Sequence, residues 1–111
     1  MRSLFLLLVL VLSGCTTLDE RVSQEPSNNF ITNKSAEEYK NCLLQSWAML
    51  NQVTEVRKPN GYRILNGQMG FAGAVADIME DAGQTRVVTY IPSSSWAVIP
   101  RKMKQSAENC K

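Results

Sequence analysis

One stretch decides the fold of this chain: Val53-Thr54-Glu55-Val56-Arg57-Lys58-Pro59-Asn60-Gly61-Tyr62-Arg63-Ile64-Leu65. Its first part has the β-branched composition of a strand, and Lys58-Pro59-Asn60-Gly61 is a turn signal in which Asn-Gly favours positive φ. After the turn, Tyr62 and Ile64 fall on one face of a second strand. We therefore predict a β-hairpin over residues 53–65.

A helix is expected before the hairpin. Ser35 and Glu38 stand at the N-cap and N3 positions of a capping box. After this box one stripe recurs with helical spacing, apolar except for one serine, and its members are Tyr39, Cys42, Leu43, Ser46, Trp47 and Leu50. The sequence therefore predicts a helix over residues 36–51 that turns this stripe toward the core.

Two more strands and a last helix are expected after the hairpin. A turn is predicted over residues 66–70. Residues 73–80 fit a helix or a strand, and we favour the strand because only a short gap separates them from a clear strand at 85–91. Pro100 fits the first turn of a final helix. Its apolar positions are Ile99, Met103, Ala107 and Cys110.

These elements predict an α+β fold in the order α-β-β-β-β-α. We expect a four-stranded antiparallel meander with the N- and C-terminal helices packed on one face.

The N-terminus has the composition of an export signal. Arg2 precedes an unbroken apolar run of nine residues, Leu4–Leu12. A helix of this length rises about 14 Å, against a bilayer hydrocarbon core of about 30 Å. We therefore interpret residues 1–14 as a signal peptide rather than a transmembrane helix.

The tetrapeptide Leu12-Ser13-Gly14-Cys15 resembles the lipobox of bacterial lipoproteins. With it, the chain resembles small bacterial envelope lipoproteins of unassigned function. The resemblance implies cleavage before Cys15, a diacylglycerol on its thiol and, in the mature protein, three acyl chains that anchor it to the membrane. Thr16 then implies sorting to the outer membrane. The alternative is an ordinary secretory signal followed by a chance cysteine.

The residues after Cys15 are mostly polar and include Pro26, so we expect a lipid anchor and flexible tether over residues 15–34. Phe30 and Ile31 are the exception, and we expect them to dock on the domain as an N-terminal strand or staple. The folded domain is expected over residues 35–111. A domain of this size is marginal and generally needs a covalent staple.

With Cys15 lipidated, two of the three cysteines remain. An exported domain meets an oxidising periplasm, and Cys42 and Cys110 lie on the apolar stripes of the two helices. We predict a Cys42–Cys110 disulfide that closes a loop of about 68 residues, worth about 4 kcal/mol in the chain-entropy model. A redox or metal role is disfavoured because the chain has no His and no Cys-x-x-Cys pair.

Composition excludes several functions. Without His there is no Ser-His-Asp or Cys-His set and no imidazole metal ligand. The net charge of +2 gives no electrostatic indication of nucleic-acid binding.

The remaining polar motifs have ordinary explanations. Ser93-Ser94-Ser95 fits a loop and helix start better than a nucleophile. The acidic residues Asp77, Glu80 and Asp81 fit a solvated turn better than a cation site. A basic cluster could meet anionic lipid or a glycan, but it fits a solvated face that complements the dipole of the last helix better. Its members are Arg101, Lys102, Lys104 and Lys111.

We therefore expect a non-enzymatic module, tethered to the outer membrane on its periplasmic side, that binds another envelope protein or stabilises an assembly. No cofactor, metal, nucleic acid or small-molecule substrate is expected. Phe71 and Trp96, which lie beside loops, are candidates for partner contact.

Two other classes of function stay open. One is an inhibitor or immunity protein against a periplasmic toxin or a cell-wall hydrolase. The other is a hydrolase that acts on cell-wall glycans through carboxylates among Glu55, Asp77 and Glu80.

Overall fold

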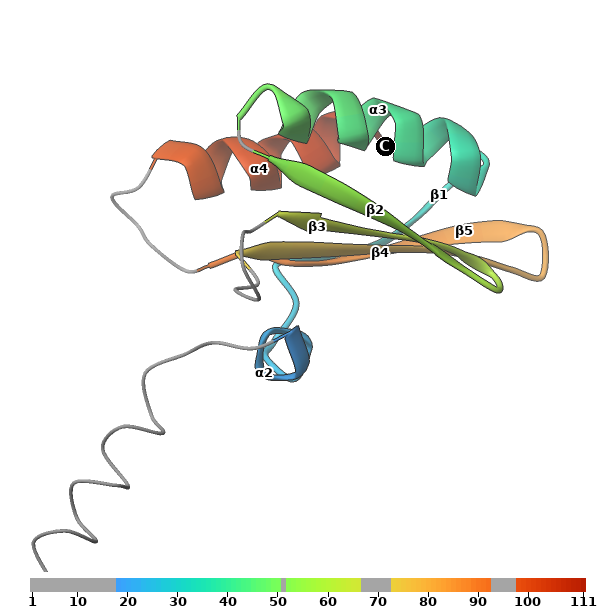
Figure 1. Cartoon of the computed structure of the whole chain (residues 1–111). Helices are drawn as coiled ribbons and strands as arrows, with labels where there is room; N and C mark the ends of the chain where they lie inside the picture. Colours follow the sequence, from blue (N-terminus) through green and yellow to red (C-terminus); the bar gives the residue numbers. More distant parts are fainter. Residues whose placement is uncertain (1–17, 51, 67–72, 93–97) are drawn as a thin grey trace, which may run out of the picture.

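The computed structural model describes residues 18–50, 52–66, 73–92 and 98–111 (Figure 1). Its elements in chain order are α2 (Leu18–Val22), β1 (Asn28–Thr32), α3 (Ala36–Ala48), β2 (Val53–Lys58), β3 (Gly61–Asn66), β4 (Ala74–Asp81), β5 (Gln84–Tyr90) and α4 (Val98–Asn109). None of the helices within these ranges combines the length and the apolar composition needed to cross a membrane.

The strands form one antiparallel sheet in the order β1-β5-β4-β3-β2. Helices α3 and α4 lie together on one face, which we call the helix face (Figure 1). The short helix α2 contacts β4 and lies on the other side of the sheet, which we call the open face. The α+β class and the packing of both long helices on one face are therefore confirmed.

The number of strands is corrected from four to five. The additional strand, β1, comes from residues 28–32, inside the range assigned to the tether, so Phe30 and Ile31 dock as a strand. The polar composition of β1 gives no clear strand signal in the sequence, but its buried polar side chains have hydrogen-bond partners in the fold. Asn28 Oδ1 accepts from Thr89 Oγ1 at 2.6 Å, and Asn28 Nδ2 donates to Glu108 Oε1 at 3.0 Å. Satisfied polar groups can be buried without a large penalty, so a polar strand joins the sheet.

Helix α3 begins as predicted, because the Ser35 side chain accepts a hydrogen bond from Glu38 N at 3.1 Å. It ends at Ala48, three residues earlier than expected. The apolar stripe is confirmed: Tyr39, Leu43 and Trp47 are fully buried.

The β2–β3 hairpin is confirmed, but its turn differs from the prediction. Lys58 pairs with Gly61, so Pro59 and Asn60 form the two-residue loop. Asn60 and Gly61 do not have positive φ. Glycine is required at position 61 for another reason, because the backbones of β3 and β4 come so close there that a Cβ would lie 1.9 Å from the Ile78 carbonyl oxygen.

Residues 74–81 are a strand, so the favoured alternative for this segment is confirmed. The β4–β5 turn holds Ala82 at φ 54° and Gly83 at φ 79°. Positive φ at both central residues is what a two-residue type I′ hairpin loop requires. The alanine is therefore the strained member of this turn.

Of the stripe predicted for the last helix, Met103, Ala107 and Cys110 are buried, whereas Ile99 is 44 % exposed. Pro100 lies in the first turn, as expected. The expectations on residues 67–70 and on Ser93-Ser94-Ser95 fall outside the described residues.

We predict that Ala82→Asn stabilises the protein by about 0.5–1 kcal/mol, because asparagine tolerates the left-handed region better than alanine does. Ala82 is exposed, so packing does not contribute to the difference. Urea unfolding monitored by Trp fluorescence measures it.

The matched control is Gly83→Ala, where a Cβ would meet no atom within 4 Å. This change should destabilise the protein through the backbone alone. An Ala82→Asn variant that is less stable than the parent contradicts the assigned turn.

Candidate functional site

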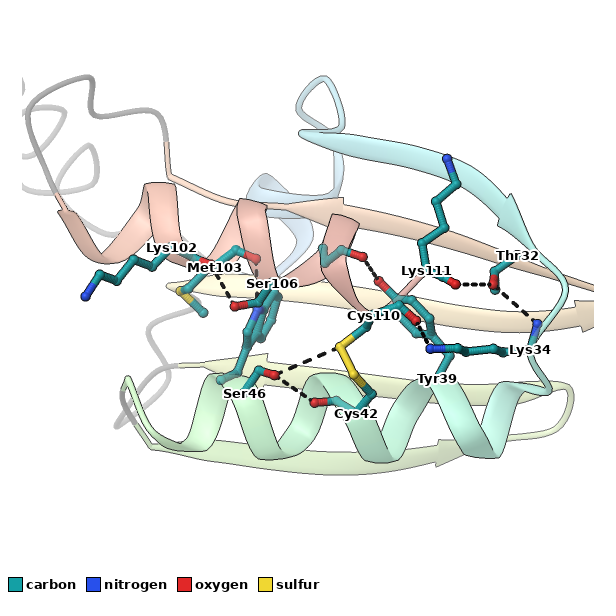
Figure 2. Close-up of a disulfide and its surroundings, with 12 residues drawn as sticks. Thr32, Lys34, Tyr39, Cys42, Ser46, Lys102, Met103, Ser106, Cys110 and Lys111 are labelled. Carbon is teal, nitrogen blue, oxygen red and sulfur yellow. Dashed lines mark hydrogen bonds between the residues drawn. A yellow bond between two sulfur atoms is a disulfide. The ribbon is translucent and has the colours of Figure 1, made fainter.

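The predicted disulfide is present between Cys42 of α3 and Cys110, the residue after α4, with 5.8 Å between the two Cα atoms (Figure 2). Ser46 Oγ donates to the Cys42 carbonyl at 3.0 Å and lies 3.9 Å from Cys110 Sγ. Lys34 Nζ donates to the Cys110 carbonyl at 2.6 Å. The disulfide joins α3 to the end of α4, and the Lys34 hydrogen bond adds the segment after β1 at the same place.

Two aromatic residues of α3 extend this connection along α4. Trp47 Nε1 donates to the Met103 carbonyl at 3.1 Å, and the Tyr39 hydroxyl donates to the Ala107 carbonyl (Figure 2). Burial, followed by the negative charge of Glu108, raises the pKa of Tyr39 well above its ordinary value, so the hydroxyl remains a donor. We call the disulfide and these two hydrogen bonds the α3–α4 clamp.

The acidic residues of the strand region each have a partner. Asp77 accepts from Arg63 through two bonds, Nε to Oδ1 at 2.6 Å and Nη2 to Oδ2 at 2.9 Å. Lys58 Nζ lies 3.8 Å from Asp77 Oδ1. This bidentate pair is largely buried and lies on the open face, so we interpret it as a structural ion pair.

The two glutamates lie on the helix face. Glu80 Oε1 accepts from Ala36 N at 3.1 Å and so satisfies an otherwise free amide at the start of α3. Glu55 Oε1 lies 2.8 Å from Lys40 Nζ, and this hydrogen bond raises the pKa of Lys40. Lys40 also lies 4.6 Å from the centre of the Tyr62 ring.

The structure does not bring these carboxylates together. Glu55 belongs to β2 and Glu80 to β4, with β3 between them, while Asp77 points to the opposite side of the sheet. Glycoside hydrolysis needs two carboxyl groups that flank one bond. Within the described residues, no group of His, Cys, Asp and Glu could hold a metal ion.

The basic cluster is divided between the two ends of α4. Arg101 and Lys102 lie in its first half and Lys104 just past its middle, and the last turn has no basic residue. These three are exposed, as a solvated face requires, but they do not lie where they would complement the helix dipole. Lys111, beyond the helix, lies 4.8 Å from the centre of the Phe30 ring.

A hollow lies at each end of α3. One, of about 420 Å³, lies between the start of α3 and the β2–β3 turn, with Glu37, Arg57 and Tyr62 in its wall. The other, of about 320 Å³, lies between the end of α3 and α4, with Met49 and Lys102 in its wall.

Of the predicted site residues, the structure places Cys42 and Cys110 and joins them. Cys15, Phe71 and Trp96 lie outside the described residues.

The Arg63–Asp77 pair was not foreseen. Its sequence signal is weak, because opposite charges at alternating positions of two strands pair only once the register is known.

Comparisons with known proteins give no relative. No family model matches the chain, and neither a curated protein nor a solved structure matches it.

We predict that Cys42→Ser combined with Cys110→Ser lowers the free energy of unfolding by about 4 kcal/mol, because the unfolded chain loses its cross-link. Urea unfolding of the variant and of the parent measures the change.

Ser46→Ala is the control, since it removes the hydroxyl beside the disulfide and keeps the covalent bond. It should cost far less than the double change. A parent protein whose unfolding midpoint is unchanged by dithiothreitol contradicts a stabilising disulfide.

Proposed function

We propose that this chain is an exported lipoprotein, anchored through Cys15 to the periplasmic side of the outer membrane, whose domain is a non-enzymatic binding or assembly module. The observation that supports this most is the Cys42–Cys110 disulfide. Disulfides persist in oxidising compartments. The pairing also leaves Cys15, at the end of the lipobox-like tetrapeptide, as the remaining thiol of the three.

The charged groups of the domain support a binding role over catalysis. Asp77 is held by Arg63, Glu80 caps α3 and Glu55 pairs with Lys40. A catalytic acid or base must be within hydrogen-bond reach of the proton that it transfers. The three carboxylates are instead used to hold the fold.

For the partner we propose another envelope protein that binds at β2. This strand is the last in the sheet order of the described chain, and its four central residues are exposed. Val56 is 39 % exposed on the open face, in the register position beside Arg63. An edge strand with an accessible apolar side chain offers both backbone and side-chain contacts.

We predict that Cys15→Ser abolishes labelling of the protein by radioactive palmitate and moves it out of the membrane fraction, since the acyl chains supply the attachment. Metabolic labelling and membrane fractionation of the expressing bacterium measure this. Cys42→Ser combined with Cys110→Ser should keep the label, which separates lipidation from disulfide formation. Equal labelling of the Cys15→Ser variant overturns the proposed anchor.

We predict that a photoreactive benzoylphenylalanine at Val56 forms a discrete protein adduct in living cells. The same group at Gln84, an exposed position at the far end of the sheet, is the control. Immunoblotting detects the adducts. Adducts that are no stronger from Val56 than from Gln84 contradict binding at β2.

A further inference from the structure

The chain enters the sheet at one end, and at the same end α3 finishes and α4 begins. The register pairs Val53 with Asn66, Asn66 with Ala74 and Asn28 with Thr89, so β1, β2 and β4 all begin at this end. Helix α3 ends just before β2, and α4 begins after β5 has ended here (Figure 1). We call it the anchor end.

The N-terminal segment arrives at the same end. Ser27 Oγ accepts from Ile91 N at 3.0 Å, immediately after β5. Helix α2 ends five residues before Ser27 and contacts β4. Cys15 precedes Leu18 by three residues, which reach about 10 Å even when fully extended. A lipid on Cys15 would therefore attach close to α2.

Exposed apolar side chains are concentrated at the anchor end. Met49 is 88 % exposed, Val98 52 % and Ile99 44 %. Met49 and Lys102 line one hollow, and Val98 lies one helical turn before Lys102 on the same side of α4. We call Met49, Val98 and Ile99 the apolar tip. The other two large apolar residues with comparable exposure in the described chain, Ile31 and Val56, lie on opposite edges of the sheet.

Positive charge borders the apolar tip. Arg101 and Lys102 are exposed in the early part of α4, and its first turn has no acidic residue. Cations near a helix N-terminus oppose the dipole and cost helix stability. Their placement is therefore not explained by the helix itself, and it complements a negatively charged surface.

We propose that the apolar tip, with Arg101 and Lys102, seats the domain on the anionic phospholipid bilayer that holds its anchor. This inference rests on the proposed lipid at Cys15. Exposed apolar side chains enter the boundary between head groups and acyl chains, and the bordering cations attract lipid phosphates. The β2–β3 and β4–β5 turns, at the other end of the sheet, then point away from the membrane.

The test uses the lipidated protein in vesicles of phosphatidylcholine and phosphatidylglycerol. A benzoylphenylalanine replaces Ile99 in one preparation and Asn60, in the β2–β3 turn, in another. Irradiation followed by mass spectrometry measures phospholipid adducts. We expect several-fold more adducts from the Ile99 position.

A charge reversal tests the basic border. Arg101→Glu should lower the adduct yield at Ile99 by about fivefold or more, since each cation near an anionic bilayer is worth about 1 kcal/mol. Glutamate favours the start of a helix, so this variant remains folded. The control is Arg57→Glu, which makes the same charge change at an exposed position near the far turn.

The two proposals fail differently. A protein that does not float with the vesicles in a density gradient lacks the lipid anchor, which overturns the proposed function and the docking with it. A protein that floats but gives equal adduct yields from the Ile99 and Asn60 positions keeps its anchor and overturns the docking alone. Equal effects of Arg101→Glu and Arg57→Glu overturn the role of the basic border.

Discussion

The fold depends on the connection between its two long helices. Helix α3 comes directly before the β2–β3 hairpin and α4 comes last, so the covalent bond between Cys42 and Cys110 closes most of the domain into one loop. A domain of this size buries too little apolar surface to tolerate a loosely attached helix. The Trp47 and Tyr39 hydrogen bonds to α4 carbonyls then fix where the helix lies along α3.

The clamp has a consequence for the N-terminal strand. Lys34 donates to the Cys110 carbonyl, and Asn28 donates to Glu108 of α4, so β1 is held by the element that the disulfide fixes. Phe30 adds an edge-to-face contact with the Tyr39 ring at 5.9 Å. The chain therefore enters the sheet at a place that the C-terminus stabilises. This arrangement makes the position of the anchor end a property of the whole domain.

Local chemistry explains which features the sequence could predict. Capping at Ser35, the helical stripe and the β2–β3 hairpin depend on neighbouring residues, and they are confirmed. The fifth strand depends on partners that are distant in sequence, such as Thr89 for Asn28. The same holds for the Arg63–Asp77 pair, which needs the register. Pairing of Cys42 with Cys110 was predictable because composition left few alternatives, whereas exposure of Met49 and Ile99 required the three-dimensional structure.

We propose two different fates for the three cysteines: Cys15 carries lipid, and Cys42 and Cys110 form the disulfide of the α3–α4 clamp. Intact-mass spectrometry of the protein purified from membranes, after treatment with iodoacetamide in denaturant, tests this proposal most directly. The account predicts a chain that begins at Cys15 and carries acyl groups, with no alkylated thiol before reduction and two after it. An unlipidated chain with an alkylated Cys15, or free Cys42 and Cys110 before reduction, would contradict it.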